Sequence, residues 1–188
     1  ELDIFIFTLG LTEAWRSKFD NTTFPICPLV VSESARKEDY FLHNFSMDEI
    51  ERNLEEFIDL LSVVNKSAKI ILTVSPVPLV ATGFKDHVLV SNCYSKSLLR
   101  VAAGNISEKY SNVDYFPSFE IVNTIPGYFS NDLRTVTQKG IDHVMKVFIK
   151  NFLLLASESC QKQQKELIKI KSNVDRFDEQ CDEIIYEK

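Results

Sequence analysis

The sequence lacks the features that define several large classes of protein. It contains no apolar run of the roughly 20 residues that a membrane-spanning helix requires. Its first residues read as a strand, and not as the basic start and apolar centre of a signal peptide. Acidic residues outnumber basic ones, 27 to 21, and the formal net charge is −6. This balance argues against a general nucleic-acid binder, which needs a basic surface to displace phosphate counterions.

Metal-binding cysteine motifs are also missing. The four cysteines, Cys27, Cys93, Cys160 and Cys181, form no CxxC pair, so we expect neither a metal site nor a cofactor. Scattered free thiols are typical of a reducing compartment, which favours a cytoplasmic location. The first residue is Glu and not Met, and we therefore expect the chain to be part of a longer protein.

Three short apolar segments predict the strands of a buried parallel sheet. Residues 4–9 form an almost unbroken β-rich run that ends at Gly10. Residues 69–75 form the second segment and stop at a proline, whose backbone lacks an amide donor. Residues 113–116 form the third, which also ends at a proline.

Between the strands, apolar residues at helical spacing predict helices. One opens at Ser46, which forms the pattern of a capping box with Glu49. Further helices are expected over residues 91–110 and 138–155, with a short helical turn over residues 11–15 that Thr12 would cap. The remaining segments, 19–40, 79–90 and 131–137, read as loops, with a short extended piece at 28–31.

This alternation predicts an α/β protein, namely a three-layer, flavodoxin-like α/β/α domain over residues 1–156 with a parallel sheet. With 188 residues, 45% of them apolar, the chain is long enough for one domain with a substantial core. Residues 157–188 carry apolar residues at alternating spacings of 3 and 4. They predict an amphipathic helix that either forms a coiled coil in a homo-oligomer or docks on its own domain.

Several polar residues follow the ends of the predicted strands. Gly10, Thr12 and Glu13 follow the first strand, Ser75 ends the second, and Asp132 lies in a polar loop. The carboxyl ends of parallel strands meet at one edge of a sheet, where open α/β proteins bind their ligands. We therefore expect these residues to lie together at a binding site.

A second group lies at the start of the helix predicted over residues 91–110. Asn92, Ser95 and Lys96 are spaced i, i+3 and i+4 and so share one helical face. A helix N-terminus with a nearby lysine can hold a carboxylate or phosphate. The alternative is that Asn92 caps the helix and Lys96 is solvated. Trp15, the only tryptophan, either stacks on a sugar or is a buried anchor.

Four motifs of the chain occur together in one known family. They are Thr8-Leu-Gly-Leu-Thr-Glu-Ala-Trp15, Thr73-Val-Ser-Pro-Val-Pro78, Asn92-Cys-Tyr-Ser-Lys-Ser97 with Leu99-Arg100, and Tyr115-Phe-Pro-Ser-Phe-Glu-Ile121. In this order they resemble the GSCFA family, which looks like a branch of the SGNH (GDSL-like) hydrolases. The resemblance implies a serine nucleophile near the N-terminus, oxyanion donors from a Gly block and an Asn block, and a base from an Asp-x-x-His loop.

The resemblance also implies roles for particular residues. Gly10-Leu-Thr-Glu13 matches the block normally written Gly-x-Asn-Asp, with Thr12 in place of the Asn donor. Asp132-Leu-Arg-Thr135 matches the Asp-x-x-His loop, but Thr135 cannot act as a general base near neutral pH. His87 is the best substitute base, whereas we expect His143 to be structural and His43 to have no evident partner. The Gly-Ser-Cys-Phe-Ala motif itself is absent, and we expect it upstream of Glu1.

Three functions remain open from the sequence. The first is an SGNH-like acyl-ester hydrolase or acyltransferase that acts on an acylated carbohydrate, such as one of surface polysaccharide biosynthesis. The second is a catalytically inactive domain that binds an anionic ligand through Asn92, Lys96 and the Thr12 edge. The third is an assembly role, in which residues 157–188 bring chains together.

Overall fold

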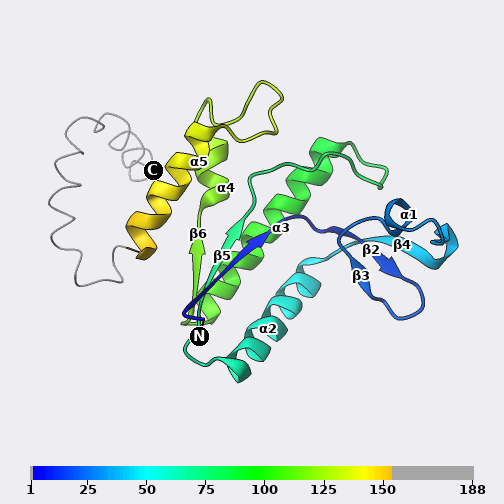
Figure 1. The fold of residues 1–188 in the computed structure, drawn as a ribbon, viewed down its shortest axis with the longest axis horizontal. Coiled ribbons are helices and arrows are strands. Elements are labelled where there is room, and N and C mark those ends of the chain that lie inside the picture. Colours follow the sequence, from blue (N-terminus) through cyan, green and yellow to red (C-terminus); the bar gives the residue numbers. More distant parts are fainter. Residues whose placement is uncertain (1, 154–188) are drawn as a thin grey trace, which may run out of the picture. The chain divides into compact units, whose positions relative to one another are not determined.

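The fold is built on a three-stranded parallel sheet. The structure, a computed structural model, describes residues 2–153, and residues 2–144 lie within one compact unit. Strands β1 (Ile4–Leu9), β5 (Lys69–Val74) and β6 (Val113–Phe116) pair in the order β1-β5-β6, all parallel. Figure 1 shows their carboxyl ends at the same edge of the sheet. All three strands that the sequence predicts are confirmed.

The middle strand, β5, is buried on both faces. Ile70, Leu72 and Val74 belong to the main hydrophobic core, and none of them is measurably exposed. Ile71 and Thr73 point to the opposite face, because successive side chains of a strand alternate, and they are also buried. Burial on both faces explains why this segment is apolar without alternation.

Two long helices pack against the core face of the sheet. Helix α2 (Met47–Val64) begins with the predicted capping box: the Ser46 hydroxyl accepts a hydrogen bond from the Glu49 amide, and the Glu49 carboxylate accepts one from the Ser46 amide. Helix α3 (Val88–Lys109) contributes buried residues to the same core. It begins before the predicted start because His87 Nδ1 accepts a hydrogen bond from the Leu89 amide and caps it. Asn92 therefore lies inside the helix and is not its cap.

Helix α4 (Ser118–Thr124) packs on the opposite face of β5, while Ile6 and Thr8 of β1 on that face are exposed. The Ser118 hydroxyl lies 2.6 Å from Thr73 Oγ1 and donates a hydrogen bond to the Val74 carbonyl at 2.9 Å. The next helix, α5 (Gln138–Phe148), is followed by a π-helical turn, η2 (Ile149–Leu153). The parallel sheet flanked by helices makes this an α/β protein, consistent with a flavodoxin-like α/β/α fold.

A second, antiparallel sheet follows β1 directly and is not anticipated by the sequence patterns. Its strands are β2 (Glu13–Ser17), β3 (Thr23–Phe24) and β4 (Tyr40–Asn44), in the order β3-β2-β4. The helical turn predicted for residues 11–15 is therefore wrong. Residues 13–17 pair with β4, which is distant in sequence, and this pairing satisfies their backbone hydrogen bonds in extended form.

The segment predicted as a long loop over residues 19–40 also contains regular structure. It holds β3, a four-residue helix, α1 (Pro28–Val31), and a 3₁₀ turn, η1 (Lys37–Asp39). The extended piece predicted at 28–31 is wrong, because a proline at the first helical position is already set for a helix.

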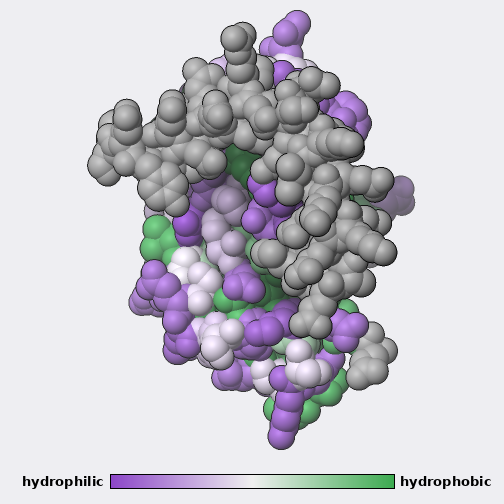
Figure 2. Space-filling view, turned by 90° about the vertical axis from the view of Figure 1, so that its left-hand side faces the viewer, coloured by the Kyte–Doolittle hydropathy of each residue, from purple (hydrophilic) through white to green (hydrophobic). Residues whose placement is uncertain are grey.

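The face of the molecule in Figure 2 has an ordinary mixed surface. In the part not drawn in grey, hydrophobic residues lie singly or in small groups between hydrophilic ones.

Among the residues that the structure describes, no helix combines the length and hydrophobicity needed to cross a membrane. The predicted domain end at 156 and the amphipathic segment 157–188 lie outside the described residues.

Candidate functional site

The carboxyl ends of β1 and β5 form one edge with the start of α3. The Ser75 amide donates a hydrogen bond to the Leu9 carbonyl at 2.8 Å, so Gly10 and Ser75 follow adjacent strand ends. The N-terminal half of α3 and the loop between α4 and α5 reach the same end of the sheet (Figure 1). The predicted convergence of the first two strand ends is therefore seen in the structure.

Lys96 is the charged residue at this edge. Its side chain is only 2% exposed, and its Nζ donates a hydrogen bond to the Gly10 carbonyl at 2.8 Å. Within residues 2–153 no carboxylate forms an ion pair with it, so two of the three donors of the ammonium remain for a ligand. Burial lowers the pKa of the amine to about 8. The alternative that Lys96 is a solvated surface residue is wrong.

Two cavities meet at Lys96. We call the first, of about 310 Å³, the α3 pocket. It is lined by Pro76, Pro78, Leu89, Asn92, Cys93, Lys96, Ser97, Phe119, Asn123, Phe129 and Leu133. We call the second, of about 440 Å³, the apolar groove. It is lined by Gly10, Leu11, Ser75, Val77, Pro78, Leu79, Val80, Ala81 and Lys96.

The other two residues of the α3 face hold the strand ends in place. Asn92 Oδ1 accepts a hydrogen bond from the Leu79 amide at 2.8 Å, which fixes the segment after β5. The buried Ser95 hydroxyl accepts one from the Thr12 amide, also at 2.8 Å. Asn92, Ser95 and Lys96 thus bind three different backbone positions at the sheet edge, and Ser95 has a positioning role.

Thr12 is tied into the protein by all its polar groups. It is 1% exposed, its amide donates to Ser95 Oγ, and its hydroxyl donates to Asn44 Oδ1 at 2.6 Å. Its carbonyl accepts a hydrogen bond from the Phe45 amide at 2.9 Å. Donation from Thr12 to a ligand stays a prediction, and it requires one of these bonds to break. The neighbouring Glu13 carboxylate accepts a hydrogen bond from the Thr82 hydroxyl at 2.8 Å.

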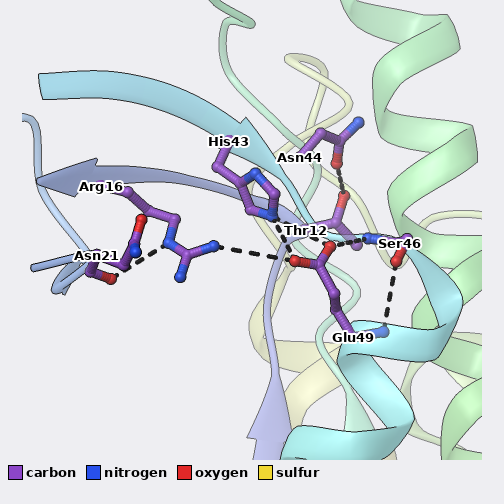
Figure 3. A network of polar contacts seen from close by, with 7 residues as sticks. All are labelled: Thr12, Arg16, Asn21, His43, Asn44, Ser46 and Glu49. Carbon is purple, nitrogen blue, oxygen red and sulfur yellow. Dashed lines mark hydrogen bonds and ion pairs between the residues drawn. The ribbon is translucent and has the colours of Figure 1, made fainter. Parts of the chain in front are cut away.

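A polar network joins β2, β4 and α2 beside Thr12 (Figure 3). Glu49 lies at its centre and contacts His43 Nε2 at 2.9 Å and the Arg16 guanidinium at 3.9 Å. The pKa of the Glu49 carboxyl is lowered, chiefly by the hydrogen bond from the Ser46 amide. The expectation that His43 lacks a partner is wrong, because β4 places its ring over the first turn of α2. Asn44, the residue after His43 in β4, accepts a hydrogen bond from the Thr12 hydroxyl beside this network and has no bond of its own to Glu49.

The Asp132 loop is closed by its own residues. Asp132 Oδ2 accepts a hydrogen bond from the Thr135 hydroxyl at 2.6 Å, and Oδ1 accepts from the Thr135 and Arg134 amides. These bonds, with the Thr135 hydroxyl first, lower the pKa of Asp132 to about 2. Leu133 between them has a left-handed φ of 55° and lines the α3 pocket. Asp132 and Thr135 line neither of the two cavities.

The remaining candidates lie away from the two cavities. His87 caps α3 and lines neither of them, and partly buried Trp15 pairs with Leu42 and Phe24 in the antiparallel sheet. His143 Nδ1 lies 2.7 Å from the Tyr128 hydroxyl. Within residues 2–153, no three side chains of the metal-binding types lie close enough together to hold an ion.

Most of the residues that line the two cavities are not among the site residues that the sequence predicts. Cys93 and Ser97 come from the same turns of α3 as Asn92 and Lys96, while Phe119 and Phe129 come from a more distant part of the chain. The sequence holds one signal for them: the segment after Ser75 is apolar although its prolines exclude a strand. In the structure Val77 and Val80 of this segment are 51% and 64% exposed. Apolar residues in a loop at a ligand-binding edge indicate a binding surface.

Comparison with known proteins gives one result. The model of a family described as the GSCFA family matches residues 1–148. Neither the curated proteins nor the solved structures gave a match.

Proposed function

The chain belongs to the GSCFA family, and from this premise we propose that it is an acyl-ester hydrolase or acyltransferase of the SGNH type that acts on an acylated carbohydrate. The proposal depends on one observation above all, which is the buried Lys96 amine at the carboxyl edge of the parallel sheet. Ligands of open α/β proteins bind at that edge.

Lys96 has the chemistry that an acyl site requires. When an ester is attacked, negative charge develops on the acyl oxygen, and donors fixed in a water-poor site stabilise it. The Lys96 ammonium is fixed by its bond to the Gly10 carbonyl and has donors left for that oxygen. With a pKa of about 8, most of the amine is protonated at pH 7.

The α3 pocket supplies groups that suit a sugar. Asn92 brings its side-chain NH₂, because its side-chain carbonyl is bonded to the Leu79 amide. Asn123 brings its side-chain carbonyl, because its NH₂ is bonded to the Phe119 carbonyl. Ser97 brings a hydroxyl, and Phe119 and Phe129 bring aromatic walls. Amides and hydroxyls pair with sugar hydroxyls, and apolar walls with a few polar groups are typical of small-molecule sites. We assign the carbohydrate to this pocket and not to Trp15, which lines neither cavity.

A second function, ligand binding without turnover, is favoured by the Asp132 loop. The residue at the expected histidine position, Thr135, donates its hydroxyl to Asp132 and cannot act as a base near neutral pH. In this form of the proposal, Lys96 and the α3 pocket hold an acylated or anionic sugar, and no bond is broken.

The test uses the full-length protein. It is incubated with acetylated mono- and oligosaccharides and with p-nitrophenyl esters, and both acyl release and acyl transfer are measured. We expect turnover of an acylated sugar that falls at least about 100-fold in Lys96→Met, as for the loss of an oxyanion donor. Lys66→Met, at an exposed lysine, is the matched control.

The outcomes separate the two functions. Binding of an acylated sugar that needs Lys96, without turnover of any substrate, establishes the second function and ends the first. Neither binding nor turnover across the panel, with the protein folded, ends both.

A further inference from the structure

The apolar groove beside Lys96 has a different lining from the α3 pocket, to which we assign the sugar. Its walls include Leu11, Val77 and Val80, which are 41%, 51% and 64% exposed. The groove lies at the carboxyl edge of the parallel sheet, where open α/β proteins bind their ligands. The polar side chains that line it are those of Ser75 and Lys96, and the Ser75 hydroxyl already accepts a hydrogen bond from the Val77 amide.

The groove is held open by the fold. Pro76 and Pro78 prevent the segment after β5 from continuing the sheet. The bond between Asn92 Oδ1 and the Leu79 amide holds the same segment on α3. The apolar side chains of this segment are therefore fixed around the groove.

Charge at the end of the groove selects the kind of occupant. Lys96 lines both cavities, and among the residues that the structure describes no acidic one lines either of them. An apolar wall that ends at an ammonium with no carboxylate partner among residues 2–153 is complementary to a hydrocarbon chain with an oxygen-bearing, anionic head. A carboxylate or the acyl oxygen of an ester is such a head.

We propose that the apolar groove binds the hydrocarbon chain of a medium-length acyl group whose head oxygen is held by Lys96. The inference rests on the proposed function, because it names the acyl group for the same site. A methylene group occupies about as much space as the roughly 30 Å³ share of a water molecule, so an eight-carbon chain fills about half of the groove of about 440 Å³. An acetyl group leaves nearly all of it empty.

The first test is a chain-length series on the unmodified full-length protein. Binding of the straight-chain carboxylates from C2 to C10 and of the matched primary alcohols is measured by calorimetry. We expect affinity to rise about twofold for each methylene between C4 and C8, about half the free energy of full burial of a CH₂ group, because the groove is open to solvent. Octanoate should bind at least about tenfold more tightly than octanol, as expected for a hydrogen bond to a charged group.

Variants then locate the site. Val80→Asn places an amide on the exposed wall of the groove and should weaken octanoate binding at least about tenfold. Val63→Asn, at a valine of α2 that is 80% exposed against 64% for Val80, should leave it unchanged. Lys96→Met should remove the difference between octanoate and octanol. Affinity that is independent of chain length, or equal effects of the two valine variants, overturns the proposal.

The outcome of the octanoate experiments can be distinguished from the outcome of the turnover test of the proposed function. Chain-length-dependent binding without turnover of any ester supports the groove and counts against the enzyme. Turnover of acetylated sugars by a protein that binds no longer carboxylate supports the enzyme and overturns the groove.

Discussion

Replacing Lys96 by Met should make the protein more stable at neutral pH. Methionine keeps most of the volume of the lysine stem in a site that is 2% exposed, and it removes the buried charge without leaving a large cavity. Most substitutions of buried residues destabilise a protein, so a gain here indicates a residue that is retained for binding and not for stability.

The size of the gain follows from the environment of the amine. Burial lowers the pKa of Lys96 from 10.5 to about 8, which corresponds to about 3 kcal/mol of free energy against the folded state when the amine is charged. The variant loses the charge-assisted hydrogen bond to the Gly10 carbonyl, which contributes about 1.5 kcal/mol. Gly10 is exposed, so water can replace the lost donor. We therefore expect Lys96→Met to raise the free energy of unfolding by about 1.5 kcal/mol at pH 7.

The dependence on pH identifies the cause. Below pH 8 the amine is protonated in both the folded and the unfolded chain, and the parent protein carries the full cost of the buried charge. Between pH 8 and 10.5 the unfolded chain binds a proton that the folded one does not, so the parent gains stability as pH rises. At pH 10 the remaining cost is below about 1 kcal/mol, and the advantage of the variant should be close to zero.

Urea unfolding of the parent, Lys96→Met and Lys66→Met at pH 7 and pH 10 measures this difference. A Lys96→Met variant that is less stable than the parent at pH 7 would refute the reasoning. A gain of the same size at both pH values would refute it as well, because the gain would then not come from the charge.

Other predictions concern the cavities and the Asp132 loop. Octanoate affinity, measured by calorimetry, should be level below pH 8 and fall by up to about tenfold per pH unit above it, as Lys96 loses its proton. The control variant Cys93→Ser, which removes the thiol that lines the α3 pocket, should give the same profile. An affinity that does not change with pH would contradict the pairing of Lys96 with the carboxylate. Leu133→Asn should raise the free energy of unfolding by about 1 kcal/mol in urea, because asparagine tolerates a φ of 55° better than leucine; a loss would show that the strain is absent. Thr135→Val should raise the pKa of Asp132 from about 2, followed by NMR of the carboxyl carbon, and an unchanged value would contradict the assigned cause.

The elements that the sequence predicts correctly are those with local signals. The capping box at Ser46, the apolar run of β5 and the proline that ends it can all be read from neighbouring residues. The β2–β4 sheet has no such signal, because its backbone hydrogen bonds depend on pairing between segments that are far apart in the chain. Propensity alone therefore gave a helical turn where tertiary pairing forms a strand.

The candidate site also has features that local sequence predicts and features that depend on distant residues. The spacing of Asn92, Ser95 and Lys96 predicts their shared face, but the burial of Lys96 depends on a carbonyl 86 residues away, at Gly10. The Thr12 donors are engaged by Ser95 and Asn44, which are 83 and 32 residues distant. A sequence motif predicts which residues lie close together, and only the folded structure shows which of their polar groups are already hydrogen-bonded within the protein.

The central claim is that the Lys96 amine holds the head of an acyl ligand, and NMR titration of its Nζ in the full-length protein tests this most directly. The account predicts a midpoint near pH 8 in the free protein and a higher midpoint with octanoate bound, because the carboxylate favours the charged amine. A midpoint near 10.5, or one that octanoate does not move, would contradict it.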